Sequence, residues 1–308
     1  MDLGPILVTG AHRSGTTWVG KMLSTGREIA YISEPLNVWH RPGVMRAPTQ
    51  YWYTYITQDN QKPFEDAFKE MLKFQYHTRL ELKSLRSAKD FFRMVRDWWI
   101  FWEGRRYSQR PLIKDPFALF SVEWFVKTLE CKVVIVVRHP AAVVSSLSRL
   151  GWDFDFSDFL NQPLLMRDWL KPFHKEMDWM RESIQDVIER GSLLWKMLYK
   201  VVSELKERQP DIILLRHEDL SKDPINEFMQ VYDQLGIKFL SANRQAIDSS
   251  SSEKNPKEIS TKNVHSVRID SQVNIKSWQN RLSAEEIDRI YHITQDVAAQ
   301  YYSEDDWR

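Results

Sequence analysis

The chain of 308 residues is 43% hydrophobic and 28% charged, which is typical of a globular protein and excludes a disordered or fibrous chain. Its 43 Lys and Arg residues balance 42 Asp and Glu residues, so no overall positive charge attracts nucleic acid or an anionic membrane, and any anion must bind locally. The single cysteine, Cys131, excludes an internal disulfide. The sequence shows neither a basic leader nor an apolar run long enough to span a membrane, so we expect a cytoplasmic protein with no transmembrane segment.

Short runs rich in β-branched residues alternate along the chain with longer amphipathic stretches. The short runs predict buried strands at residues 6–9, 30–33, 112–114, 133–137 and 212–215. The amphipathic stretches predict helices at residues 17–23, 64–76, 90–102, 121–129, 141–150, 192–208 and 283–301, the last opened by a capping box of Ser283 and Glu286. This alternation predicts an α/β fold, a central parallel sheet of about five strands flanked by helices.

Two segments interrupt this regular pattern. Residues 37–110 carry little strand signal and predict a helical cap inserted into a single domain that spans residues 1–308. Residues 249–262 are rich in Ser, Lys, Glu and Asn without apolar periodicity, so a mobile loop is expected there.

The strongest chemical signal is the first strand with the turn and helix that follow it, ILVTGAHRSGTTWVGKML at residues 6–23. Glycines let backbone amides approach a phosphate, and a helix N-terminus favours negative charge. Gly10 and Gly15 have the spacing of a Walker A loop, but Thr16 stands where that loop has its lysine, and Arg13 places a cation earlier. The turn therefore predicts an anion site that is poorly suited to ordinary kinase or GTPase chemistry.

The string RSGTTW resembles the 5′-phosphosulfate loop of sulfotransferases that use 3′-phosphoadenosine 5′-phosphosulfate (PAPS), and it matches that loop without a gap. A second element of the family, an Arg at a strand end with a Ser eight residues later, corresponds to Arg138 and Ser146. The resemblance implies a P-loop NTPase-like sulfotransferase fold, with PAPS as co-substrate, 3′-phosphoadenosine 5′-phosphate (PAP) as product, and no metal. It also implies donor-binding roles for Arg13, Ser14, Gly15, Thr16, Thr17, Trp18, Arg138 and Ser146.

Two C-terminal features depart from the family pattern. RHEDLSKDP at residues 216–224 resembles a segment that usually has a tyrosine beside adenine, and here His217 takes its place. The Arg-Lys-Gly triplet of the animal cytosolic members is absent, and Arg268 or Lys262 is the candidate to complete the 3′-phosphate clamp. SWQNRLSAEEIDRI, by contrast, is similar to a Trp and Leu-Ser-x-Glu-Glu pattern of related chains.

Polar side chains follow every predicted strand, and ligands of open parallel sheets bind at the carboxyl ends of the strands. Those side chains are Arg13, Glu34, Lys114 with Asp115, Arg138 and His217. Glu34 is predicted to be the catalytic base, because Pro35 biases it to an extended conformation and it follows a strand that is expected to lie beside the phosphate loop. SEPL resembles a Glu-Pro of carbohydrate-modifying members.

The resemblance gives Lys114 the role of contacting the bridging and leaving oxygens, and Arg13 adds a cation. Pro116 stands where animal cytosolic members have a catalytic histidine, and Asp115, His40 and His12 remain as other candidates for the base.

The acceptor is predicted to be a hydroxyl of a carbohydrate, a glycolipid or a small alcohol. The cap region holds aromatic residues that either form core or line an acceptor cleft with arginines: Tyr51, Trp52, Tyr53, Tyr55, Trp98, Trp99, Phe101 and Trp102, among Arg93, Arg96, Arg105, Arg106 and Arg110. The alternatives are a P-loop kinase or NTPase and a catalytically inactive nucleotide-binding module. No His or Cys spacing indicates a metal site, and a homo-oligomer stays open.

Overall fold

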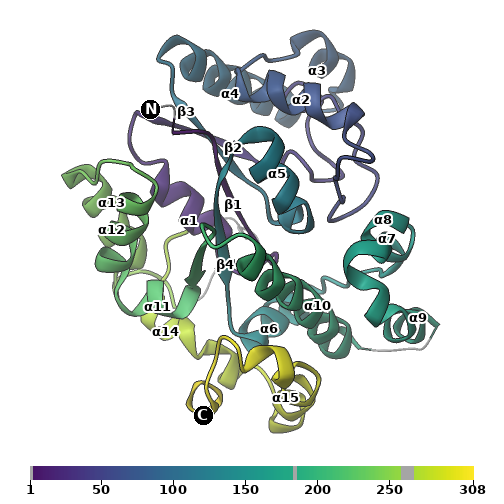
Figure 1. Cartoon of the computed structure of the whole chain (residues 1–308). Coiled ribbons are helices and arrows are strands. Elements are labelled where there is room, and N and C mark those ends of the chain that lie inside the picture. Colours follow the sequence, from purple (N-terminus) through teal and green to yellow (C-terminus); the bar gives the residue numbers. More distant parts are fainter. Residues whose placement is uncertain (1–2, 183–185, 258–266) are drawn as a thin grey trace.

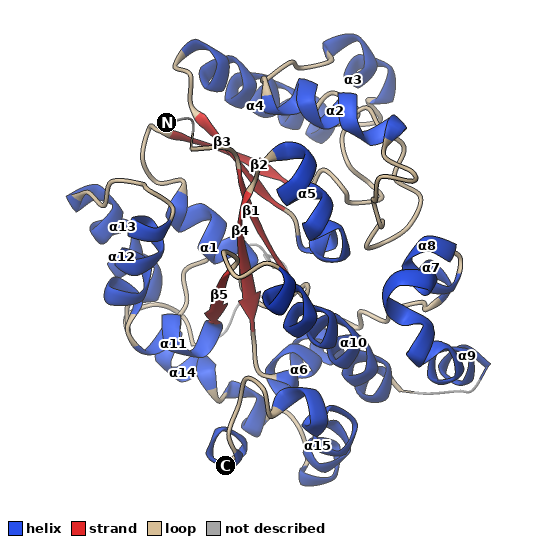
Figure 2. Cartoon of the chain, in the orientation of Figure 1, coloured by secondary structure: helices blue, strands red, loops and turns tan. Residues whose placement is uncertain are grey.

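The computed structural model describes residues 3–182, 186–257 and 267–308. These residues form one five-stranded sheet, and all of its strand pairs are parallel. The strands are β1 Ile6–Gly10, β2 Ile29–Ser33, β3 Arg110–Lys114, β4 Lys132–Val137 and β5 Ile213–Arg216. Helices flank the sheet on both faces (Figures 1 and 2). The predicted α/β fold is confirmed, with each strand boundary within two residues of the prediction.

The longer helices are α1 Thr16–Leu23, α2 Lys62–Leu72, α4 Ala88–Arg106, α5 Val122–Leu129, α6 Pro140–Leu150, α9 His174–Glu182, α10 Val187–Arg208, α12 Pro224–Gln234, α13 Ser241–Ser251 and α15 Ala284–Ala298. Shorter ones are α3 Thr78–Ser84, α7 Ser157–Leu160, α8 Pro163–Leu165, α11 His217–Lys222 and α14 Ser271–Ile275, with 3₁₀ turns including η1 Pro116–Ser121, η4 Ser277–Asn280 and η5 Glu304–Trp307. The capping box of Ser283 and Glu286 begins α15 as predicted.

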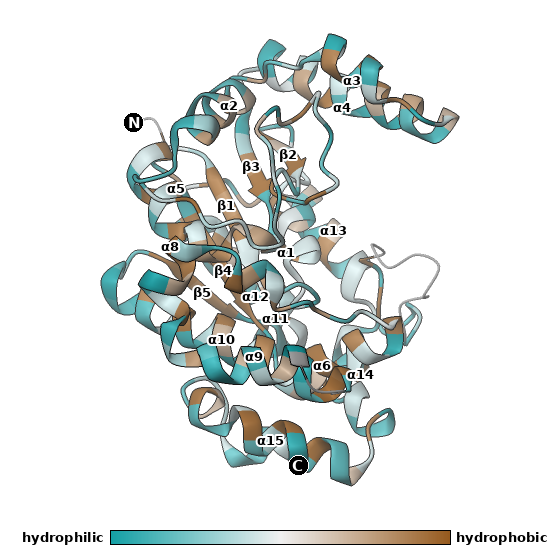
Figure 3. Cartoon of the chain, turned by 90° about the vertical axis from the view of Figure 1, so that its right-hand side faces the viewer, coloured by the Kyte–Doolittle hydropathy of each residue, from teal (hydrophilic) through white to brown (hydrophobic). Residues whose placement is uncertain are grey.

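The strands are buried on both faces because nearly every residue in them is apolar. Successive side chains of a strand point to opposite faces, so Leu7 packs in one hydrophobic cluster while Ile6 and Val8 pack in another. The first cluster includes Trp195 of α10, and the second includes Trp18 of α1. Figure 3 shows the strands as mainly hydrophobic ribbons between helices that carry more hydrophilic residues.

The strand order is β2-β3-β1-β4-β5. The strand before Glu34, β2, does not pair with the phosphate-loop strand β1, because β3 lies between them. Both faces of each strand are apolar, and the sequence pattern therefore carries no information on which strands pair. The order has a useful consequence: Lys114 is in register with Ser33 on one side and with Val8 on the other.

The segment between β2 and β3 contains α2, α3 and α4 (Figure 1), which agrees with the helical character predicted for residues 37–110. The mobile loop predicted at 249–262 is wrong at its start, since Ser249 to Ser251 belong to α13 and Ser250 is buried. Ser250 Oγ accepts a hydrogen bond from Trp18 Nε1 at 2.9 Å. This specific contact holds Ser250 in a segment whose sequence shows no apolar periodicity. Residues 258–262 of that prediction lie outside the described residues.

Candidate active site

The phosphate loop joins the carboxyl end of β1 to α1. Gly10 and Gly15 have φ angles of 149° and 102°, and Arg13 has the left-handed φ of 71°. Gly15 is the N-cap of α1 and has no side chain to occupy the amides of the first turn. The backbone N–H groups of the loop and the positive end of the α1 dipole thus face the same place, which is the geometry of an anion site.

Neither loop glycine has room for a side chain. A Cβ on Gly10 would lie 2.4 Å from the carbonyl oxygen of Val136 on the neighbouring strand β4. A Cβ on Gly15 would lie 2.4 Å from Cδ2 of His217. The loop is therefore packed tightly against β4 on one side and against the start of α11 on the other.

Arg13, Arg138 and Ser146, predicted from separate parts of the sequence, meet in the structure. Arg13 Nε donates to Ser146 Oγ at 3.0 Å, and Arg138 Nη1 donates to the carbonyl oxygen of Arg13 at 3.0 Å. Pro140 begins α6, which places Ser146 on that helix as expected.

The charges of this cluster fit a polyanion. Burial, together with the nearby cations Arg138 and Arg149, lowers the pKa of Arg13 to about 10. Burial also lowers the pKa of Arg138, although the carboxylate of Glu218 opposes the shift. An anion between two neighbouring guanidiniums that are partly or fully removed from water would offset the cost of their charges.

Trp18 and His217 form an aromatic wall beside the loop. Their ring centroids lie 5.7 Å apart, and Trp18 also packs edge-on against Phe228. His217 Nδ1 is 3.2 Å from Ser221 Oγ, and burial with the charge of Arg138 lowers the pKa of His217 well below its ordinary value. The imidazole of His217 therefore lies directly over Gly15 of the phosphate loop.

Glu34 and Lys114 meet at the carboxyl ends of β2 and β3. Lys114 Nζ donates to Glu34 Oε1, and Asn37 Nδ2 donates to Glu34 Oε2 at 2.9 Å. Burial opposes the charge on Lys114, but the pairing with Glu34 and neighbouring groups outweighs it and raises the pKa of Lys114. The parallel register causes this meeting, because Ser33 lies opposite Lys114 and Glu34 follows directly.

Glu34 does not have the extended backbone predicted from the proline after it. Its φ is 51°, because the chain turns sharply here: Glu34 N donates to the carbonyl oxygen of Lys114, and Asn37 N donates to that of Glu34. Asp115 holds this turn by accepting from Leu36 N at 2.6 Å. The tertiary bonds override the local preference of a residue before proline.

A cavity of about 560 Å³ opens beside this pair. Its lining includes residues of α1, of the two strand ends and of α4: Thr17, Lys21, Glu34, Lys114, Arg93, Arg96, Asp97, Ile100 and Phe101. The cavity therefore runs from the first turn of the phosphate-loop helix to α4. Its position at the carboxyl edge of the sheet is where ligands of open parallel sheets bind.

The other predicted residues have different surroundings. Asp115 is fully buried, and burial together with the charge of Glu34 raises its pKa to about 7, but both its oxygens accept backbone amides. His40 lines the cavity and its Nδ1 is 2.8 Å from the carbonyl oxygen of Asn37. His12 is held by Tyr53, 2.7 Å from its Nδ1, and burial lowers its pKa to about 4. Arg268 is exposed, and within the described part of the chain no hydrogen bond or ion pair joins it to the site.

The aromatic residues of the inserted segment divide between core and surface. Tyr53, Tyr55 and Phe101 are buried, whereas Trp98, Trp99 and Trp102 are exposed. Arg110 donates to the carbonyl oxygens of Gly4, Leu235 and Leu3, a structural role. Of the predicted acceptor arginines, Arg93 and Arg96 line the cavity.

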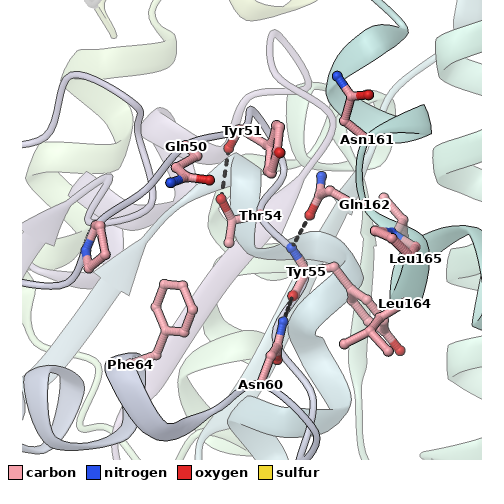
Figure 4. Close-up of a pocket in the computed structure, with 12 residues that line it drawn as sticks. Gln50, Tyr51, Thr54, Tyr55, Asn60, Phe64, Asn161, Gln162, Leu164 and Leu165 are labelled. Carbon is pink, nitrogen blue, oxygen red and sulfur yellow. Dashed lines mark hydrogen bonds between the residues drawn. The ribbon is translucent and has the colours of Figure 1, made fainter.

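A second cavity of about 290 Å³ lies between residues 48–64 and α7–α8 (Figure 4). Its polar groups are joined to one another: Gln162 Oε1 accepts from Tyr55 N, and Asn60 Nδ2 donates to the carbonyl oxygen of Tyr55, each at 2.8 Å. These bonds fix the loop around Tyr55. In the described ranges, no group of three or more His, Cys, Asp or Glu side chains is placed to hold a metal ion.

Sequence reasoning missed Asn37 and Ser250, which position the site, and it named Tyr53 only as a cap aromatic, without its contact to His12. Asn37 is a polar residue three positions after Glu34, a spacing typical of a turn. Tyr53 and Ser250 act over separations of 41 and 232 residues, and no local pattern indicates such contacts.

The chain is similar in structure to two solved sulfotransferase domains. One is from the curacin biosynthetic pathway, with a TM-score of 0.51 and 14% identity over 96% of each chain. The other is from the Synechococcus PCC 7002 olefin synthase, with a TM-score of 0.48 and 17% identity over 97% of this chain and 95% of that one. No curated protein matches the sequence.

A family model described as the sulfotransferase domain matches residues 3–302. The enzyme class predicted from the two donor-loop elements is thereby confirmed. Because the match extends over nearly the whole chain, the protein belongs to the sulfotransferase domain family.

Proposed function

We propose that this protein transfers the sulfuryl group of PAPS to a hydroxyl group of a carbohydrate, a glycolipid or a small alcohol, with Glu34 as the base. The observation that carries the proposal is the Lys114–Glu34 pair in the wall of a cavity that also reaches Thr17 of the phosphate-loop helix. A donor bound at that loop and an acceptor in the cavity meet at these two side chains.

On the donor side, the amides of α1 and Arg13 bind the 5′-phosphosulfate, and Arg138 with Ser146 binds the 3′-phosphate. The contact between Arg13 and Ser146 supports this division, because it joins the two predicted subsites. Trp18 and His217 supply the aromatic surface for adenine.

On the acceptor side, Glu34 accepts the hydroxyl proton as the acceptor oxygen forms its bond to sulfur. The bond between sulfur and the bridging oxygen breaks, and PAP leaves with the negative charge. Lys114 changes partner from Glu34 to that oxygen, where its charge stabilises the leaving phosphate. An ionised carboxylate has about four lone-pair sites, so Glu34 retains acceptor capacity beside Lys114 and Asn37.

The donor assignment is tested by calorimetric binding of PAP, ADP and Mg-ATP. PAP should bind best without metal, because Arg138 and Ser146 recognise the 3′-phosphate. Arg138→Ala should weaken PAP binding by about 2–3 kcal/mol, the scale of a lost charge-assisted hydrogen bond, and should change ADP binding little. Preference for Mg-ATP would support the kinase alternative and reject this one.

The base assignment is tested by Glu34→Gln, measured as sulfuryl transfer in an acceptor screen of sugars, glycolipids and alcohols. Turnover should fall by roughly 10²–10⁴-fold, the contribution of a positioned general base, while PAP binding is retained. Glu28→Gln is the matched control, since Glu28 is an exposed glutamate just before the opposite end of β2. Wild-type turnover in Glu34→Gln would remove Glu34 from the mechanism.

A further inference from the structure

The outer face of α4 carries a group of large apolar residues, most of them aromatic, that are exposed. Six of its residues are between 41% and 71% exposed: Phe91, Phe92, Val95, Trp98, Trp99 and Trp102. The helix lies at the outer end of the molecule, beyond the β2–β3 edge of the sheet (Figures 1 and 3). We refer to these six residues as the α4 face.

The α4 face is one side of the helix and lies opposite the side that packs inward. At about 100° per residue, its six positions fall within about 120° of the helix circumference. Met94, Asp97, Phe101 and Gly104 are the buried residues of the helix and occupy the other side. Burying the inward side therefore leaves the aromatic residues outside, so α4 carries large apolar residues on both sides.

Charges around the α4 face are arranged by sign. The carboxylates turn inward or are paired: Glu81 and Asp90 bind Arg41, and Asp97 binds Arg96. Glu103 is partly buried. The cations of α3 and α4 and the turn between them are exposed, namely Arg79, Lys83, Arg86, Lys89, Arg93, Arg96, Arg105 and Arg106. A chain of formal net charge +1 thus carries a local excess of exposed cations on α3 and on α4, the helix that bears the α4 face.

We propose that the α4 face binds the surface of an anionic lipid bilayer. Aromatic rings flanked by Arg and Lys suit the boundary between headgroups and acyl chains, where the rings are buried and the cations meet lipid phosphates. The helix lies in this interface and does not cross the membrane. In the described part of the chain, no helix is long and apolar enough to span a bilayer.

The helix that carries the α4 face also forms part of the cavity wall. Arg93, Arg96 and Ile100 of α4 line it, so the helix is at once a wall of the cavity and the surface that meets lipid. The acceptor is then an amphiphile whose hydroxyl-bearing head enters the cavity while its tail stays in the bilayer. This consequence rests on the proposed function, whereas lipid binding itself does not.

The test is cosedimentation of the full chain with vesicles of phosphatidylcholine alone and of phosphatidylcholine mixed equally with phosphatidylglycerol. The wild type should bind the anionic vesicles and release at high salt. The double variant Phe92→Ser with Trp99→Ser should reduce the partition coefficient by roughly tenfold or more. Arg105→Ser with Arg106→Ser should reduce binding to anionic vesicles only.

Trp179→Ser is the matched control, since Trp179 of α9 is 53% exposed and lies outside the α4 face. Circular dichroism and PAP binding report whether each variant is folded. Equal vesicle binding by the wild type and the α4 double variant would overturn the proposal, as would no binding by the wild type. A dimer that the same double variant abolishes, without vesicle binding, would assign the face to a second copy instead. PAP binding without vesicle binding would reject this inference and leave the proposed function standing.

Discussion

At the scale of single residues, the site depends on close packing around Gly15. Its φ of 102° is a backbone conformation that residues with a side chain rarely adopt, and His217 occupies the space that a Cβ would need. Gly15→Ala should therefore lower the free energy of unfolding by roughly 2 kcal/mol and weaken PAP binding as the loop moves. Urea denaturation and calorimetry measure the two effects.

Gly26→Ala is the control for this substitution. Gly26 has no left-handed φ, and the nearest atom to its Cβ position is 3.8 Å away. That variant should keep both stability and PAP binding. A Gly15→Ala protein that binds PAP as the wild type does would show that the loop and His217 are not tightly coupled.

At the scale of elements, the sequence predicted the strands and most long helices, but not how they are arranged. Runs such as residues 133–137 are apolar at every position, so they indicate a buried strand without indicating its neighbours. The insertion of β3 between β2 and β1 had to come from the structure, and with it the register that pairs Lys114 with Glu34. The donor loop was predictable because its residues are contiguous. The turn at Glu34 was not, since Asp115 holds it from 79 residues away.

At the scale of the whole molecule, His139 joins the central sheet to the C-terminal segment. It precedes α6, and its ring stacks on Trp278 of η4 at 5.0 Å and lies 4.4 Å from the ring of Trp307 in η5. Among the described residues, neither ring nitrogen has a hydrogen-bond partner. The imidazole ring acts as an apolar group. Its contacts with Trp278 and Trp307 attach the C-terminal segment next to Arg138.

This packing makes stability depend on pH. Burial, with the cations Arg216 and Arg138, lowers the pKa of His139 to about 3, whereas a histidine in an unfolded chain titrates near 6.5. The unfolded chain therefore binds the proton first as the pH falls, so stability is retained above about pH 6.5 and is lost towards pH 3.

The substitution His139→Phe removes the group that binds this proton but keeps a stacking ring. From pH 7 to pH 5, the wild type should lose about 2 kcal/mol more stability than His139→Phe. Urea denaturation at the two pH values measures the difference, and His292→Phe on the exposed side of α15 should retain the wild-type loss. Equal losses in the wild type and His139→Phe would mean that the C-terminal contact opens before the protein unfolds.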